Sequence, residues 1–150
     1  MNKYYTPSIE EFHVGFEFEY CPLFKDEWIK KVLEPTKRGL SKLVETYEDY
    51  PDDSLADEMY RVKYLDKTDI EELGFEESFD EPDEWFWKFK GDINIQLYFD
   101  DKIRENNQGI GISIYNSKYG TNDWDTGLVF IGYIKNKSEL KVLLKQLGIC

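Results

Sequence analysis

The sequence has little cysteine and no long hydrophobic run. Its two cysteines, Cys21 and Cys150, are too few for a disulfide framework and lack any Cys-x-x-Cys or Cys/His spacing. We therefore expect free thiols. No segment approaches the roughly 20 consecutive apolar residues of a membrane span, and the first seven residues contain no apolar run of the signal-peptide kind. The sequence thus predicts a cytoplasmic protein with no membrane partner.

Histidine is almost absent, which restricts catalysis and metal binding. The only histidine, His13, lies roughly 13 Å from Glu17 at about 3.3 Å per strand residue, too far to share one ion or proton. Glu17 and Glu19, roughly 6.6 Å apart along one strand, approximate a carboxylate pair of the glycosidase kind. No nucleophile motif, phosphate-binding glycine loop or EF-hand spacing occurs. We expect no metal, no cofactor and no catalysis, with a Glu17/Glu19 hydrolase as an alternative.

Basic residues are also scarce, and the formal net charge is −12. The segment 43–84 alone holds seventeen acidic residues against three basic ones. Such a field repels nucleic acid and anionic membranes and attracts basic protein surfaces. We therefore expect no direct binding to nucleic acid. The segment is either a docking surface for a basic protein or a solvated insertion.

Aromatic residues, in contrast, are abundant at 17% of the chain, which favours strands and a bulky core. A strand at 128–134 is followed by the clearest helix, in which Leu140, Leu143, Leu144 and Leu147 lie on one stripe. Asn136 with Glu139 is typical of a capped helix start, and Gly148 of a helix end.

The remaining chain predicts an α+β fold with a mainly antiparallel sheet of about six strands, and helices on one of its faces. At 150 residues we expect a single domain, 1–150. The expected strands are 12–20, 59–65, 85–90, 93–99, 110–114 and 128–134, with a hairpin turn at 90–92. The expected helices are 26–33, 36–47, 67–73 and 137–147, and loops occupy 49–58, 76–84, 100–109 and 116–126.

Cations and aromatics alternate along these strands in a way that suits a phosphorylated nucleotide, since bases stack on rings and phosphates bind cations. The candidate ligand-binding residues are Arg61, Lys63, Lys88, Lys90, Trp85, Tyr115 and Trp124. An ordinary alternative exists for several of them. Arg61 and Lys63 could pair with Glu17 and Glu19 across the sheet, while Trp85 and Trp87 fill the core.

Three segments resemble small uncharacterised proteins of gut bacteria and of the phages that infect them. They contain Tyr-Tyr-Thr-Pro-Ser-Ile-Glu-Glu-Phe near the N-terminus, Val-Lys-Tyr-Leu-Asp-Lys from residue 62, and Ile-Lys-Asn-Lys-Ser-Glu-Leu from residue 134. The resemblance covers about a third of the chain and implies a phage or prophage setting, with no site residues to carry over.

Together these features favour a small acidic, phage-type binding protein. It would bind a host protein with a basic surface or a nucleotide-type ligand. One version of this hypothesis is that the binding counters host defence. The alternative from another class is a structural or assembly protein of a phage particle. Such a protein would form homo-oligomers through sheet edges or aromatic patches.

Overall fold

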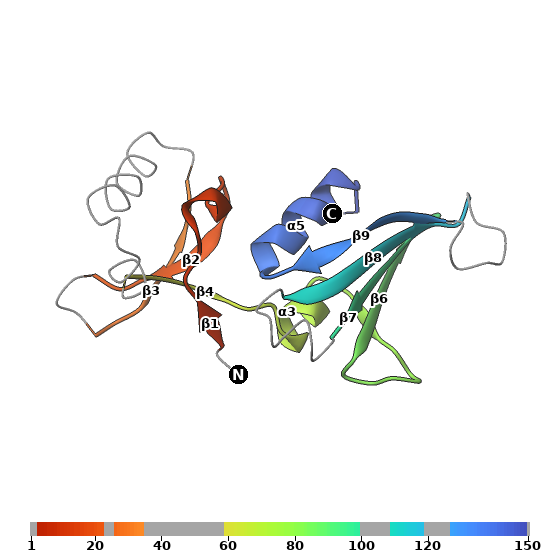
Figure 1. Cartoon of the computed structure of the whole chain (residues 1–150), viewed down its shortest axis with the longest axis horizontal. Helices are drawn as coiled ribbons and strands as arrows, with labels where there is room; N and C mark the ends of the chain where they lie inside the picture. Colours follow the sequence, from red (N-terminus) through yellow and green to blue (C-terminus); the bar gives the residue numbers. More distant parts are fainter. Residues whose placement is uncertain (1–2, 23–25, 35–58, 100–108, 119–126, 150) are drawn as a thin grey trace. The chain divides into compact units, whose positions relative to one another are not determined.

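The computed structural model describes residues 3–22, 26–34, 59–99, 109–118 and 127–149 (Figure 1). Contacts between residues divide the chain into two compact units, Met1–Tyr64 and Leu65–Cys150. Each unit contains its own antiparallel sheet, one of four strands and one of five. The expectation of an α+β fold is therefore confirmed, while that of one sheet with about six strands was wrong. A single domain stays a prediction.

The first unit is built on the sheet order β1-β4-β2-β3. Its strands are β1 (Tyr4–Tyr5), β2 (Glu17–Tyr20), β3 (Ile29–Val32) and β4 (Tyr60–Lys63), and a 3-10 turn, η1 (Ile9–Glu11), follows β1. Phe16, Leu33 and Val62 form a small buried cluster. Phe12 and Phe18 pack against it.

Two expectations in this unit were wrong. The alternation over 12–20 predicted one long strand, but the regular strand is only β2, because a turn at Gly15 (φ +88°) interrupts the segment. The apolar spacing over 26–33 predicted a helix, whereas the structure contains strand β3 paired along its whole length with β2. A helix of eight residues is marginal by itself, so pairing with a neighbouring strand prevails. The expected helix 36–47 and loop 49–58 lie outside the described residues.

The second unit is a five-stranded sheet in the order β5-β6-β7-β8-β9, with helices α3 and α5 on one face (Figure 1). Its elements are α3 (Lys67–Glu72), β5 (Glu76–Glu77), β6 (Trp85–Lys90), β7 (Ile93–Tyr98), β8 (Ile110–Asn116), β9 (Leu128–Ile134) and α5 (Lys137–Gln146). The hairpin turn at 90–92 is confirmed, since Lys90 pairs with Ile93 around Gly91 (φ +57°). β5 lies within a segment expected to be a loop. Of the expected loops 100–109 and 116–126, only Gly109 and residues 116–118 are described, and Asn116 is the last residue of β8.

Helix α5 confirms the local signals read from the sequence. The side chain of Asn136 accepts a hydrogen bond from the Glu139 amide, and Gly148 ends the helix at a φ of +67°. The Glu139 carboxylate accepts a hydrogen bond from the Lys135 amide. Leu140 and Leu144 are fully buried against the sheet. Among the described residues, no helix has the length and apolar character needed to cross a bilayer.

Candidate binding face on the second sheet

The expected cation Arg61 has a structural partner within the first unit. Its guanidinium lies 2.7 Å from the Glu19 carboxylate of the adjacent strand and between the rings of Tyr4 and Trp28, 4.0 and 3.9 Å from their centroids. Cross-strand pairing of Arg61 with Glu19, one of the two interpretations left open by the sequence, is therefore confirmed. Lys63 lies two residues further along β4, on the same side of the strand.

Glu17 and Glu19 both lie on β2, opposite Val32 and Lys30 of β3. The Glu19 carboxylate is ion-paired with Arg61 of the adjacent strand. A hydrolase using the two glutamates stays a prediction. His13 lies edge-on to the ring of Phe16, and no group of three metal-ligating side chains occurs in the described ranges.

Lys88 and Lys90 lie on the side of β6 that the helices cover. Alternation along the strand puts them on the same side as the buried Phe86. The Lys88 ammonium donates a hydrogen bond to the carbonyl oxygen of Leu73 at the end of α3, and Lys90 donates to that of Gly148 after α5. Both lysines therefore satisfy terminal carbonyls where the negative end of each helix dipole attracts a cation.

The opposite side of the second sheet is a different surface, which we term the open face. The register of β6 to β9 assigns to it Trp85, Trp87, Phe89, Asn94, Gln96, Tyr98, Gly111, Ser113, Tyr115, Ile131 and Tyr133. None of these side chains carries a charge. The described helices pack on the other face, through the cluster that contains Phe86 and Leu144.

Aromatic rings form a row across this face. Trp85 stacks with Trp87 on its own strand and with Tyr98 on the next, at centroid separations of 6.2 and 5.1 Å. Tyr98 in turn covers Gly111, since a Cβ atom there would lie 2.2 Å from the ring. Glycine at this position thus lets the ring lie against the backbone of β8.

Two amide side chains sit beside this row without hydrogen-bond partners among the described residues. They are Asn94, through its Oδ1 oxygen, and Gln96, through its Nε2 nitrogen. Gln96 is 4% exposed, and its cross-strand neighbour Ser113 is also buried. Buried amide groups normally have a partner, so Asn94 Oδ1 and Gln96 Nε2 are two atoms of this face whose hydrogen bonds are not made within the described part of the chain.

The structure thus divides the expected ligand-binding residues among three places. Trp85 and Tyr115 share the open face, Lys88 and Lys90 lie on its reverse, and Arg61 and Lys63 belong to the first unit. Trp124 lies outside the described residues. Asn94 and Gln96 were not predicted to belong to the site. Strand alternation could have shown that Trp85 and Lys88, an odd number of residues apart, lie on opposite faces.

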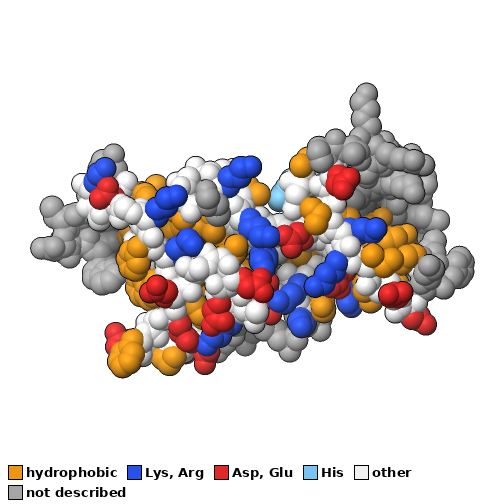
Figure 2. All heavy atoms as spheres, turned by 180° about the vertical axis from the view of Figure 1, so that it is seen from behind, with side chains coloured by type: hydrophobic (Ala, Val, Ile, Leu, Met, Phe, Trp, Pro, Cys, Tyr) orange, Lys and Arg blue, Asp and Glu red, His pale blue; other side chains and the backbone are white. Residues whose placement is uncertain are grey.

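The acidic segment forms a second notable surface, described from residue 59 onward. Eight carboxylates there are exposed: Glu71, Glu72, Glu76, Glu77, Asp80, Glu81, Asp83 and Glu84. Lys67 holds part of this surface together, with its ammonium 2.6 Å from Asp83 and 2.7 Å from Glu77. Lys67 donates a hydrogen bond to each carboxylate, and these bonds, the one to Asp83 first, raise the pKa of Lys67. The bond from Lys67 lowers the pKa of Asp83. On the molecular face in Figure 2, acidic and basic side chains are interspersed over the described residues.

Comparisons of the chain with protein-family models, with curated proteins and with solved structures found no match.

Proposed function

We propose that this chain is a non-catalytic binding protein and that its open face binds the base of a nucleotide-type ligand. The observation that carries the proposal is the uncharged row of Trp87, Trp85 and Tyr98 beside the unpaired amides of Asn94 and Gln96. Aromatic rings stack on any base, and Asn and Gln amides are the side chains that hydrogen-bond to the edge of a base such as adenine.

The ligand's phosphates have a smaller role in this proposal than the sequence alone indicated. Arg61 is paired with Glu19, and Lys88 and Lys90 bind helix carbonyls on the reverse of the sheet. The open face carries no cation: its positions on β6 to β9 are uncharged, and Glu76 of β5, opposite Trp87, is acidic. We therefore expect a nucleoside and its phosphorylated forms to bind with similar affinity, because the base supplies the contacts.

The proposed biological role follows from the resemblance to phage and gut-bacterial proteins. In a phage-infected cell, a small cytoplasmic protein that sequesters a nucleotide signal would counter a host defence that uses this signal. The same binding could serve another purpose, so the ligand is tested first.

The test is calorimetric titration with nucleosides and with linear and cyclic nucleotides, alongside tryptophan fluorescence. We expect saturable binding, and a loss of about 1–3 kcal/mol, or roughly 5- to 150-fold in Kd, for Trp87→Ala. Phe79→Ala is the matched control, since Phe79 is 98% exposed and outside the open face. A panel without heat or fluorescence change, or equal affinity in Trp87→Ala, would contradict the proposal.

A second candidate function is supported by the eight exposed carboxylates between Glu71 and Glu84. In this proposal the acidic surface docks on a host protein with a basic surface. Attraction between exposed charges is screened by salt, so affinity for a basic protein should fall steeply as ionic strength rises. Binding that does not change with salt would contradict this second proposal and leave the first untouched.

A further inference from the structure

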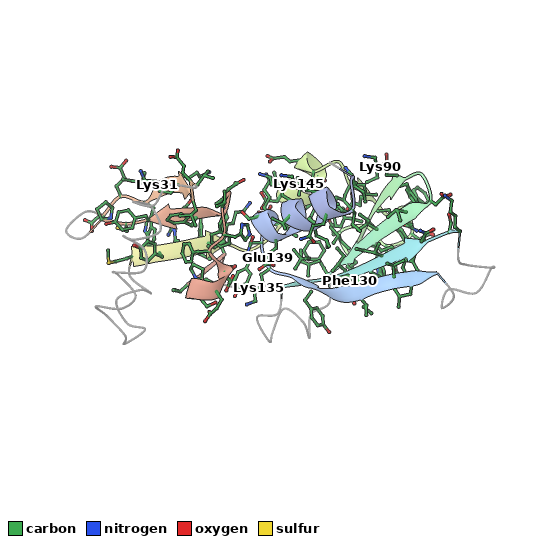
Figure 3. All side chains as sticks on the ribbon, turned by 90° about the horizontal axis from the view of Figure 1, so that it is seen from above. Lys31, Lys90, Phe130, Lys135, Glu139 and Lys145 are labelled. Carbon is green, nitrogen blue, oxygen red and sulfur yellow. The ribbon has the colours of Figure 1, made fainter. Side chains whose placement is uncertain are left out.

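Strand β9 is an edge of the five-stranded sheet, and it lacks the usual protection against edge pairing. β8 pairs with one side of β9, and no described strand pairs with the other (Figure 3). Every second residue of an edge strand directs its N–H and C=O groups away from the sheet, which makes such a strand a template for another chain. Its seven residues, Leu-Val-Phe-Ile-Gly-Tyr-Ile, contain neither a charge nor a proline.

The other sheet edges differ from β9 in the ways expected of protected strands. At the opposite edge of the same sheet, β5 has only two residues, and both are glutamates. In the first sheet, β1 has two residues, and β3 carries the exposed lysines Lys30 and Lys31. Short length and charged side chains are common means of blocking edge-to-edge pairing, and β9 uses neither.

The side chains of β9 are apolar and exposed on both sides of the strand. Ile131 and Tyr133, on the open face, are 63% and 52% exposed, and Phe130, on the opposite side, is 41% exposed. Leu128 and Val129 at the start of the strand are also exposed. A contiguous apolar patch that exceeds roughly a few hundred Å² is typical of an interaction site rather than of a free surface.

We propose that β9 pairs antiparallel with β9 of a second copy of this chain, joining two five-stranded sheets into one. Two chains of net charge −12 repel each other, which opposes association, and β9 adds no charge to the contact because its seven residues are uncharged. An antiparallel pair of identical strands is isologous and closes as a dimer.

The sequence of β9 is also self-complementary about Gly132. The register with β8 is regular from Phe130 to Ile134 and irregular before it, at Ile114/Tyr115. A twofold axis at Gly132 places Ile131 of each copy opposite Tyr133 of the other. The dimer would then contain two such cross-strand pairs, each of an aromatic and a β-branched residue. The two glycines then face each other, beside the Phe130 ring that already covers Gly132 within each chain.

Sedimentation velocity of the full-length chain over a wide concentration range tests this proposal. We expect a dimer, and a rise of about tenfold or more in its dissociation constant for Ile131→Lys and for Val129→Lys. Val32→Lys is the matched control, because Val32 is also a valine on an edge strand, with the same 57% exposure as Val129. This control should dimerise as the wild type does.

Circular dichroism and thermal unfolding of each variant confirm that a loss of dimer is not a loss of fold. A wild-type monomer at every concentration would overturn the proposal. It would also be overturned if both folded β9 variants dimerised like the wild type, or if Val32→Lys weakened the dimer equally.

Discussion

Gly109, the residue before β8, has a backbone that no other residue type can adopt without cost. Its φ is +91°, and a Cβ atom would lie 2.2 Å from the carbonyl oxygen of Ile134. We expect Gly109→Ala to lower the free energy of unfolding by about 2–4 kcal/mol, from the left-handed backbone plus a clash with main-chain atoms that cannot rotate away. Urea unfolding measures this change.

Gly91 provides the matched control for that substitution. Its φ is also positive, at +57°, but a Cβ atom would meet nothing within 4 Å. Gly91→Ala should therefore cost only the backbone contribution of about 1–2 kcal/mol. Equal losses in the two variants would show that the close approach to Ile134 is unimportant.

The ion pair of Asp83 with Lys67 should make stability depend on pH. The pKa of Asp83 lies below its ordinary value of 3.8 because the hydrogen bond from Lys67 favours the carboxylate. A group with a lowered pKa in the folded state stabilises the fold above its unfolded pKa, and this contribution is lost as pH falls through the folded value. Wild type and Asp83→Asn should thus differ in stability at neutral pH and converge as pH falls below 3.8.

Urea unfolding across an acidic pH series measures this convergence. Asn tolerates the positive φ of 65° at this position as Asp does, so the substitution removes the charge without adding backbone strain. Asp80→Asn, at a nearby exposed carboxylate, is the control. Because both partners of the pair are exposed, added salt should reduce the difference at neutral pH, and a salt-independent difference would point to another cause.

At the scale of elements, lysines of strand β6 donate hydrogen bonds to the carbonyl groups at the ends of helices α3 and α5. We expect Lys88→Met, which keeps the apolar stem, to lower the free energy of unfolding by about 0.5–1.5 kcal/mol, since the Leu73 carbonyl loses its charged donor. Chemical denaturation is the measurement. Lys31→Met, at an exposed lysine of β3, is the control, and equal effects would contradict the capping role.

Elements with strong local signals were predictable from the sequence. Helix α5 has a capping asparagine, a stripe of leucines and a terminal glycine, and the β6–β7 hairpin has a two-residue turn with Gly91. Strand β3 was not predictable, because its four residues carry little local preference and form a strand through hydrogen bonds to β2. The division into two sheets likewise depends on pairing between residues far apart in the chain.

The candidate site was predictable only in part. The alternation of Trp-Phe-Trp-Lys-Phe-Lys in β6 separates Trp85 from Lys88 without any knowledge of the fold. The position of Gln96 beside Ser113 required the order and register of β7 and β8, which the sequence does not contain. The roles of Lys88 and Lys90 also required the ends of two helices to be located in space.

For the whole molecule, the separation of the two buried clusters predicts that the second unit folds independently. Every residue of the larger cluster lies between Leu65 and Ile149, and the smaller cluster lies entirely before Tyr64. The caps of both helices, Asp66 for α3 and Asn136 for α5, also belong to residues 65–150. A fragment that contains its own core and helix caps has what a small domain needs to fold.

We therefore expect the fragment 65–150 to unfold cooperatively, with near-ultraviolet circular dichroism from its packed tryptophans and with slow amide exchange in β7 and β8. Leu144→Ala within the fragment is the control, because it removes a fully buried side chain and should lower stability by about 2–5 kcal/mol if the core has formed. Cooperative unfolding requires specific side-chain packing. If the fragment has native secondary structure but unfolds gradually and lacks fixed packing, its core depends on residues 1–64.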